Sequence, residues 1–306
     1  MTNDRLRVVS RVLGLGIDAG GTQTRWALAA APSEIVAEGA VRGMSALQVG
    51  EGNNVRDAMA ELAAAALPHG RPARIHGGVT GFGESTEALR RLIAAPFGLD
   101  PALVSLVTDV EITYLDLFAP GEGYAVYAGT GSVAAFVDES GTLHRAGGRG
   151  VVLDDGGGGF WIAREALRHV WRREDERPGS WRDSPMATVL LEAIGGTGWT
   201  SSREFIYGRD RGAVGSLAQV VARAAGEDPV AREILVAAGT ELARLGVAMT
   251  GRFGPRPIAL TGRAATLHPL IAEAMRAALP SGIPFALRPS HAQHAAARIA
   301  LAKALP

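Results

Sequence analysis

The sequence predicts an α/β protein of two similar lobes, each a mixed β-sheet with flanking helices, that face each other across a cleft. Two observations favour this fold class. An apolar run, a tip rich in glycine and hydroxyl groups, and a second apolar run occur at 12–28 and again at 123–137, and this pattern is typical of a β-hairpin. After each hairpin come a third strand and further helix and strand patterns, as in an α/β sheet.

The first lobe begins with the hairpin at 12–28. The elements expected after it are a third strand at 34–39, an alanine-rich helix at 55–67, a strand at 74–81 that runs into a glycine turn, a helix at 85–95 with Ser85 as its N-cap, and a buried strand at 103–109. This βββαβαβ order indicates a mixed sheet with helices.

The second lobe repeats the opening pattern at 123–137. The elements expected after it are a strand at 143–146, helices at 160–171, 217–226 and 229–249, a strand at 257–262, and helices at 268–279 and 291–305. Between 172 and 210 the composition turns polar, and the pattern assigns no element there.

Composition excludes several classes of site. The chain of 306 residues has no cysteine, which rules out disulfides, iron–sulfur clusters, thiolate zinc sites and cysteine nucleophiles. Basic and acidic residues number 31 each, so no net field attracts nucleic acid or an anionic membrane. No apolar run reaches the roughly 18 residues of a membrane-spanning helix. We therefore expect a cytoplasmic protein with no nucleic-acid or membrane partner.

The first hairpin tip carries residue types that bind phosphate and Mg²⁺. Gly20 and Gly21 permit positive φ and close approach of the backbone to a ligand. Thr22 and Thr24 add hydroxyl donors beside a nest of N–H groups. Asp18 at the strand end is suited to hold a hydrated Mg²⁺ against phosphate oxygens. A plain tight hairpin with a solvated aspartate is the alternative.

Five segments together resemble one family. They are Asp18-Ala19-Gly20-Gly21-Thr22-Gln23-Thr24, Thr108-Asp109, Ala128-Gly129-Thr130-Gly131-Ser132, Gly147-Gly148-Arg149-Gly150 through Asp155, and Phe160-Trp161-Ile162-Ala163-Arg164-Glu165-Ala166. In this order, over nearly the whole chain, they are similar to motifs of the N-acetylglucosamine kinase branch of the BadF/BadG/BcrA/BcrD-type ATPase family. That family lies in the actin/sugar-kinase/heat-shock-protein ATPase superfamily.

The resemblance implies two ribonuclease H-like lobes, with ATP and Mg²⁺ as cofactors and a small-molecule sugar as partner. It assigns residues 8–112 to a phosphate-binding lobe and 113–290 to a lobe that binds sugar and adenosine. The last segment, 291–306, is expected to pack back on the first lobe. A homodimer is the assembly that the resemblance implies.

The resemblance also implies roles for single residues. Asp109 falls where the family keeps the general base for the sugar hydroxyl, although a helix N-cap is the plainer role for this aspartate. Asp18 would hold the metal. The ATP-binding residues implied are Gly20, Gly21, Thr22, Thr24, Gly129, Thr130, Gly131, Ser132, Ala238, Gly239 and Gly262. The sugar-binding residues implied are Gly147, Gly148, Arg149 and Asp155, with Asp154 as the second choice to Asp155.

The departures from the family's pattern fall in the sugar site. Arg149 stands where the family has a tryptophan, and Gly156 and Gly158 stand where it has a glutamate and a serine. Ala46 lies in a loop where the family tends to keep an asparagine. An arginine offers planar donors suited to a carboxylate or phosphate, so Arg149 either admits an acidic sugar or points to solvent.

The function expected is ATP-dependent phosphorylation of an amino sugar, with N-acetylglucosamine converted to N-acetylglucosamine 6-phosphate as the first choice. The alternatives are a kinase of glucosamine or another hexosamine, and a nucleotide-dependent sugar sensor without turnover. The intact Asp18 and Asp109 favour an enzyme over a sensor. Activators of 2-hydroxyacyl-CoA dehydratases, in the same superfamily, are excluded because they hold their cluster through cysteines.

Overall fold

The computed structural model describes residues 11–46, 54–83 and 86–305. Three features of the sequence-based expectation lie outside these residues: the start of the predicted first lobe (8–10), the expected N-cap Ser85, and residue 306 at the end of the segment expected to pack on the first lobe. The chain divides into two compact units, Met1–Asp116 with His291–Pro306, and Leu117–Ser290. The boundary expected at 112/113 falls inside the single helix α3, Asp109–Leu117.

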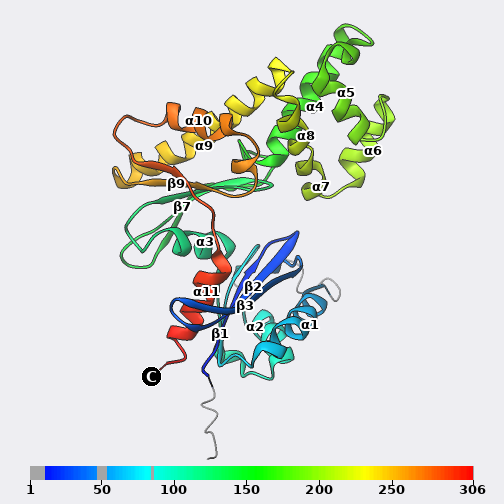
Figure 1. Ribbon diagram of the computed structural model, residues 1–306. Coiled ribbons are helices and arrows are strands. Elements are labelled where there is room, and N and C mark those ends of the chain that lie inside the picture. The colour runs from blue at the N-terminus through cyan, green and yellow to red at the C-terminus, as the bar shows by residue number, and fades with distance from the viewer. Residues whose placement is uncertain (1–10, 47–53, 84–85, 306) are drawn as a thin grey trace, which may run out of the picture. The chain divides into compact units, whose positions relative to one another are not determined.

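The first unit is built on a five-stranded mixed sheet with strand order β3-β2-β1-β4-β5 (Figure 1). The hairpin expected at 12–28 is present, because β1 pairs antiparallel with β2, whereas β4 pairs parallel with β1 and β5. The elements are β1 Gly14–Ala19, β2 Gln23–Ala31, β3 Glu34–Arg42, α1 Asn54–Ala66, η2 Leu67–His69, β4 Arg74–Val79, α2 Thr86–Ala94, η3 Ala95–Phe97, η4 Pro101–Leu103, β5 Val104–Thr108, α3, and α11 Ala292–Ala302.

The main core of this unit lies on one face of the sheet. Leu15 and Ile17 of β1 are fully buried there with Met59 and Leu62 of α1 and Leu89 of α2. Strand residues alternate between faces, so the neighbours of Leu15 and Ile17 along β1 face the other way.

Helix α11, from the far end of the chain, covers that other face. Figure 1 shows α11 (red) lying along β1 and β2 (blue). A Cβ at Gly14 or Gly16 would overlap the backbone of α11, so these two glycines allow the helix to touch the strand. Ala27 of β2 packs in the same contact with Ala297 and Leu301.

The second unit has its own five-stranded mixed sheet, in the order β10-β9-β6-β7-β8. Its elements are β6 Tyr124–Ala128, β7 Ser132–Val137, β8 Leu143–Gly147, α4 Gly159–Glu176, η5 Ser180–Asp183, α5 Pro185–Ala193, α6 Trp199–Gly208, α7 Arg211–Ser216, α8 Ala218–Ala224, α9 Pro229–Phe253, β9 Ile258–Thr261, η6 Ala264–Thr266, α10 Pro269–Ala278 and β10 Phe285–Leu287. The expected fold class, two lobes each with a mixed sheet and helices, is therefore confirmed.

The polar stretch at 172–210 contains helices that the sequence pattern did not indicate. α4 continues to Glu176, α5 and α6 follow, and none of the residues of α6 is buried. A helix without a buried stripe has no strong apolar period, so periodicity cannot reveal it.

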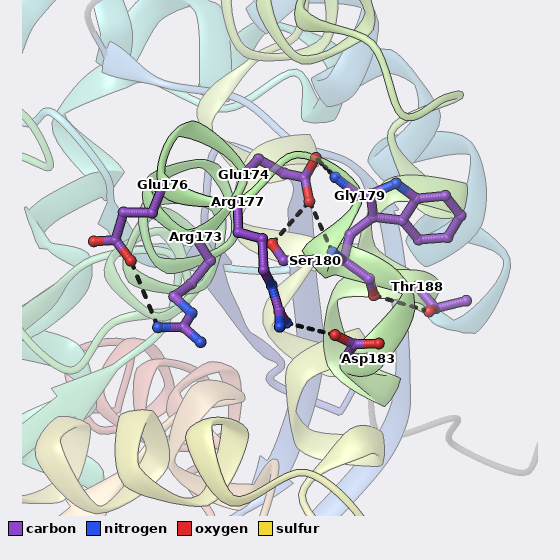
Figure 2. Close-up of polar contacts among 9 residues, drawn as sticks. Arg173, Glu174, Glu176, Arg177, Gly179, Ser180, Asp183 and Thr188 are labelled. Atoms are coloured by element: carbon purple, nitrogen blue, oxygen red, sulfur yellow. Dashed lines mark hydrogen bonds and ion pairs between the residues drawn. The ribbon is translucent and has the colours of Figure 1, made fainter.

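The turn between α4 and α5 is held by one carboxylate (Figure 2). Glu174 accepts hydrogen bonds from the N–H groups of Gly179 and Trp181, at 2.9 and 2.8 Å, and from the hydroxyl of Ser180 at 2.9 Å. Arg177 and Asp183 form an ion pair across the same turn. These contacts fix the start of the helical region α5–α8.

Helix α9 is long and apolar enough, by composition, to cross a membrane. Half of its apolar window is buried inside the protein, and its residues Leu235, Leu242 and Met249 are almost fully buried. It is the core helix of the second unit.

Candidate functional site

Asp18 stands near the end of β1, on the face that α11 covers. Its register partners are Arg25 on β2 and Gly78 on β4. Residues directly opposite each other in a sheet share a face, so the Arg25 guanidinium and the Asp18 carboxylate extend from the same side. Asp18 is half-buried.

Asp109 is brought to the same place by a helix that begins where β5 ends. It is the first residue of α3, and its Oδ1 accepts a hydrogen bond from the N–H of Val110 at 2.9 Å. The capping bond comes from the preceding residue, because Thr108 Oγ1 accepts from the N–H of Glu111 at 3.1 Å. Thr108 is thus the N-cap of α3, the role that the sequence indicated as the plainer alternative for Asp109.

Gly78 is the residue that lets α3 approach Asp18. A Cβ at Gly78 would overlap Ile112 of α3 and would lie 3.2 Å from the Cα of Asp109. Gly78 pairs with Asp18 in the sheet, so the backbone of Asp109 lies one strand away from Asp18. The two carboxylates that the sequence singled out therefore belong to one cluster within the first unit.

The charge balance of this cluster is unfavourable to an ionised Asp18. Burial and the carboxylates of Asp109 and Asp116 raise the pKa of Asp18 to about 6, against the opposing effect of Arg25. A cation bound at this carboxylate would relieve both effects. The donor set therefore fits Mg²⁺, which binds through one or two carboxylates together with water and phosphate oxygens.

The first hairpin tip offers open backbone, but in a different conformation from the one expected. Gly20 and Gly21 do not have positive φ. Gly21 and Thr22 are exposed, and a Cβ at Gly21 would meet no atom within 4 Å. Open space, rather than left-handed backbone, is what Gly21 provides, whereas a Cβ at Gly20 would lie 3.3 Å from the carbonyl oxygen of Gln23.

Thr24 is separated from that open tip. It pairs with Ala19 and so shares the face of Ile17, opposite to Asp18. Its side chain is fully buried, and its hydroxyl has no hydrogen-bond partner among the described residues. Of the first tip's predicted ATP-binding residues, Gly20, Gly21 and Thr22 lie together and Thr24 lies inside the core.

The second hairpin tip, between β6 and β7, is held by its own backbone. Gly129 donates to the carbonyl of Gly131 at 2.8 Å, and the first turn of α4 donates to the carbonyls of Gly129 and Thr130. Thr130 and Gly131 are half-exposed, and within the described chain their N–H groups have no hydrogen-bond acceptor. Free N–H groups of this kind suit an anion, and phosphate binding at this tip stays a prediction. The hydroxyl of Ser132 is already committed, because it is buried and donates to Gly156 O at 2.7 Å.

The loop after β8 carries the predicted sugar-binding residues. Gly147 and Gly148 have φ of 71° and 66°, a conformation that glycine adopts without strain. Arg149 is exposed. Asp155 is a rarer case, since it has φ of 54° without being glycine, and such residues cluster at functional sites. Asp154, the second choice, is instead paired with Arg244 at 3.0 Å.

Asp155 joins this loop to the second tip. Its Oδ1 accepts from the N–H of Gly150 at 3.1 Å, and its Oδ2 occupies the space beside Gly131, where a Cβ would overlap it. Burial raises the pKa of Asp155, although the Gly150 N–H and the Arg211 charge oppose that effect. The structure therefore brings Asp155, Gly131 and Ser132 together within the second unit.

The residues predicted to lie against adenosine have packing contacts. A Cβ at Gly239 would overlap the backbone of α10 at Ile271, and one at Gly262 would overlap the carbonyl of Ala128. Ala238 is fully buried. These contacts explain why small residues occupy the three positions, and the contact with adenosine stays a prediction.

Four residues of these clusters were not identified from the sequence: Arg25, Gly78, Asp116 and Arg211. Arg25 follows only from strand register, and Gly78 only from the packing of α3. The pattern Thr108-x-x-Glu111 is a capping-box signature, and it could have indicated that a helix begins directly after β5.

The two units, each with a five-stranded mixed sheet and helices, have the fold of the actin/sugar-kinase/heat-shock-protein ATPase superfamily. The chain belongs to the BadF/BadG/BcrA/BcrD ATPase family, whose sequence profile matches residues 15–297. ATP binding is expected of a member of this family. No curated protein sequence matches the chain.

Solved structures similar to this chain include two described as "putative N-acetylglucosamine kinase". The one from Chromobacterium violaceum has 28% identity and a TM-score of 0.72, with 95% of this chain and 99% of that chain covered. The one from Porphyromonas gingivalis has 15% identity, a TM-score of 0.73 and the same coverage. A ROK family glucokinase from Streptomyces griseus, solved with glucose and AMPPNP, has 15% identity and a TM-score of 0.60, with 95% of this chain and 98% of that chain covered.

Proposed function

We propose that this protein is an ATP- and Mg²⁺-dependent kinase that phosphorylates a hydroxyl of an amino sugar, with the 6-hydroxyl of N-acetylglucosamine as the first choice. The observation that carries the proposal is the convergence of Asp18 and Asp109 at one end of the first sheet. Phosphoryl transfer to an alcohol needs a cation site and a base of this kind. The likeness to the Chromobacterium violaceum protein supports the choice of sugar.

Asp109 is the group that would act on the sugar hydroxyl. As the oxygen of that hydroxyl bonds to the γ-phosphorus and the bond to ADP breaks, its proton would pass to the Asp109 carboxylate. The hydrogen bond from Val110 holds Oδ1 and orients the carboxylate. Mg²⁺ held at Asp18 would neutralise phosphate charge in the transition state.

Backbone donors would hold the phosphates. The N–H groups of Thr130 and Gly131 have no partner among the described residues, and Gly21 and Thr22 present exposed backbone in the first unit. N–H donors that are fixed before the reaction stabilise developing charge without reorganisation. This supports each tip, within its own unit, as a candidate phosphate-binding element.

The sugar would be recognised by the loop at 147–158. The buried Asp155 carboxylate suits hydrogen bonds from sugar hydroxyls, and the exposed guanidinium of Arg149 would select among substituents on the sugar. A sugar that carries a carboxylate should therefore be included in any substrate panel.

The test is an assay of ADP release with ATP and Mg²⁺ against N-acetylglucosamine, glucosamine, N-acetylmuramic acid, glucose and a no-sugar control. We expect one amino sugar to stimulate turnover in the wild type. Asp109→Asn should reduce that turnover by about 10²-fold or more, because the base is lost, while ATP affinity measured by calorimetry stays within about twofold.

Asp57→Asn is the matched control, since Asp57 is an exposed carboxylate on α1 of the same unit, and its turnover should equal that of the wild type. Normal turnover in Asp109→Asn would remove this residue from the mechanism. ATP binding without stimulation by any sugar would reject the kinase and favour a sensor.

A further inference from the structure

A hollow of about 410 Å³ lies among α5, α6, α7 and α8 of the second unit. This volume is within the range of small-molecule sites. It is lined by residues from all four helices and their ends: Ala193, Phe205, Arg209, Ala213, Ser216, Leu217, Gln219, Val220 and Arg223. None of the site residues assigned above is among them.

Three of the hollow's polar side chains are donors without partners, whereas the hydroxyl of Ser216 donates to the carbonyl of Ala213 at 2.6 Å. Within the described part of the chain, the guanidinium groups of Arg209 and Arg223 make no hydrogen bond or ion pair, and the amide of Gln219 makes none either. Several other arginines of this unit are paired: Arg177 with Asp183 and Arg244 with Asp154, for example. Other exposed arginines of the unit, Arg172 among them, are also unpaired within the described residues, so what distinguishes Arg209 and Arg223 is that both border one hollow.

Among the residues that the structure describes, no carboxylate lines the hollow to balance these charges. Glu192 and Glu227 lie on the neighbouring depression that Arg223 also borders, but neither forms an ion pair with Arg223. Apart from Ser216, the remaining lining is apolar, with the half-buried ring of Phe205 and the side chains of Leu217 and Val220. Such a site complements a ligand with an apolar body and an anionic group, because planar guanidinium donors match carboxylate and phosphate.

We propose that this hollow binds a small organic anion, a carboxylate or phosphate ester with an apolar body, at a site separate from the predicted ATP and sugar residues. The position of the hollow suits an effector, because α7 lies between the hollow and the second tip. Ala213 and Ser216 of α7 line the hollow, whereas Gly215 of the same helix lies against Thr130 of the second tip, so closely that a Cβ at Gly215 would be 3.3 Å from Thr130 Cγ2.

Isothermal titration of the full chain with phenyl phosphate tests the proposal. Saturating ADP, Mg²⁺ and N-acetylglucosamine are present throughout, so that the predicted catalytic site is occupied and phenyl phosphate cannot bind there. Phenol and inorganic phosphate are the two half-ligands. We expect saturable 1:1 binding of phenyl phosphate, at least about tenfold tighter than either half-ligand. Arg209→Gln and Arg223→Gln should each weaken it by about tenfold.

Arg172→Gln is the matched control, because Arg172 on α4 is also exposed and does not line the hollow; its affinity should equal that of the wild type. All three variants alter exposed side chains, and circular dichroism checks that each is folded. Absence of saturable binding, or equal affinity in the wild type and the double variant Arg209→Gln/Arg223→Gln, would overturn the proposal. Equal affinity for inorganic phosphate and phenyl phosphate would overturn the apolar part of the assignment.

Discussion

At the scale of single residues, the nucleotide-free protein tolerates an unfavourable charge. Asp18 is half-buried close to Asp109, and Arg25 compensates only in part. An ionised carboxylate held in this way lowers the free energy of unfolding at neutral pH. The same carboxylate would become favourable if a cation were bound to it. Stability is thus reduced at the position where we propose that the cation binds.

Asp18→Asn should therefore stabilise the nucleotide-free protein. The pKa of Asp18 is raised from 3.8 to about 6. The favourable contribution of its protonated form to stability is therefore fully present below pH 3.8 and is lost as pH rises through about 6. At about pH 8 the variant should be more stable by on the order of 1–3 kcal/mol, and near pH 4 it should equal the wild type. Urea unfolding at the two pH values measures this. A variant less stable than the wild type at pH 8 would contradict the charge argument.

Gly78→Ala should destabilise the protein and displace the predicted base. Its Cβ would overlap Ile112 and press on the backbone of Asp109, and overpacking of this kind costs about 1–3 kcal/mol. Thermal unfolding and ADP release should both report the change. Gly77→Ala is the control, because its Cβ would meet the flexible end of Leu106 at 3.2 Å; an equal loss in both variants would remove the special role of Gly78.

At the scale of elements, one buried carboxylate starts two helices. Asp228 Oδ1 accepts from the N–H groups of Val230 and Ala231 at the start of α9, at 2.9 and 3.1 Å. Its Oδ2 accepts from the hydroxyl of Ser184 at 2.6 Å and the N–H of Met186 at 3.0 Å, at the start of α5. Helices α5 and α9 are thereby fixed to each other at their N-terminal ends.

Asp228→Ala should cost more than the loss of an ordinary cap. It removes the acceptor of four hydrogen bonds and leaves buried donors unpaired, so we expect a loss of about 2–4 kcal/mol. Asp210→Ala is the comparison, since exposed Asp210 caps α7 alone through one bond of 2.8 Å to Ala213 and should cost about 1 kcal/mol. Equilibrium unfolding in urea compares them, and equal losses would show that the link between α5 and α9 adds nothing.

At the scale of the whole molecule, two buried groups give opposite dependences of stability on pH. Burial and the charge of Lys303 lower the pKa of His76 to about 4, against a hydrogen bond to Ser105. The contribution of His76 is therefore present above pH 6.5 and is lost as pH falls through about 4. Asp18 has the reverse trend. Each effect is on the order of 2–3 kcal/mol, so between about pH 4.5 and 6.5 they largely cancel.

His76→Gln should remove one side of this balance. As pH falls from about 7 to 4.5, the stability of the variant should rise relative to that of the wild type, because only the Asp18 effect remains. Urea midpoints across this range measure the slope. A wild-type slope retained in His76→Gln would show that His76 does not titrate as its burial implies.

The architecture was largely predictable from the sequence, because hairpins with apolar strands and Gly–hydroxyl tips have a clear local pattern. Asp18 and Asp109 could be singled out as residues at strand ends. Their proximity could not, because it depends on the register of β1 with β4 and on the packing of Ile112 against Gly78. The burial of Thr24 follows from the alternation along β2 once the face of Asp18 is known. Helix α6 escaped prediction because it lacks a buried stripe.

The placement of α11 has a consequence for how the protein is made on the ribosome. Leu117–Ser290 is one continuous segment, so the second unit can fold as soon as it has emerged. In the first unit, Gly14 and Gly16 form the surface against which α11 packs, and α11 is synthesised after the second unit. The part of this face that α11 covers, beside α3, therefore stays exposed until residues 292–302 have been translated. Nascent chains stalled before that point should bind chaperones through this face. That binding should be lost once α11 has emerged from the ribosome.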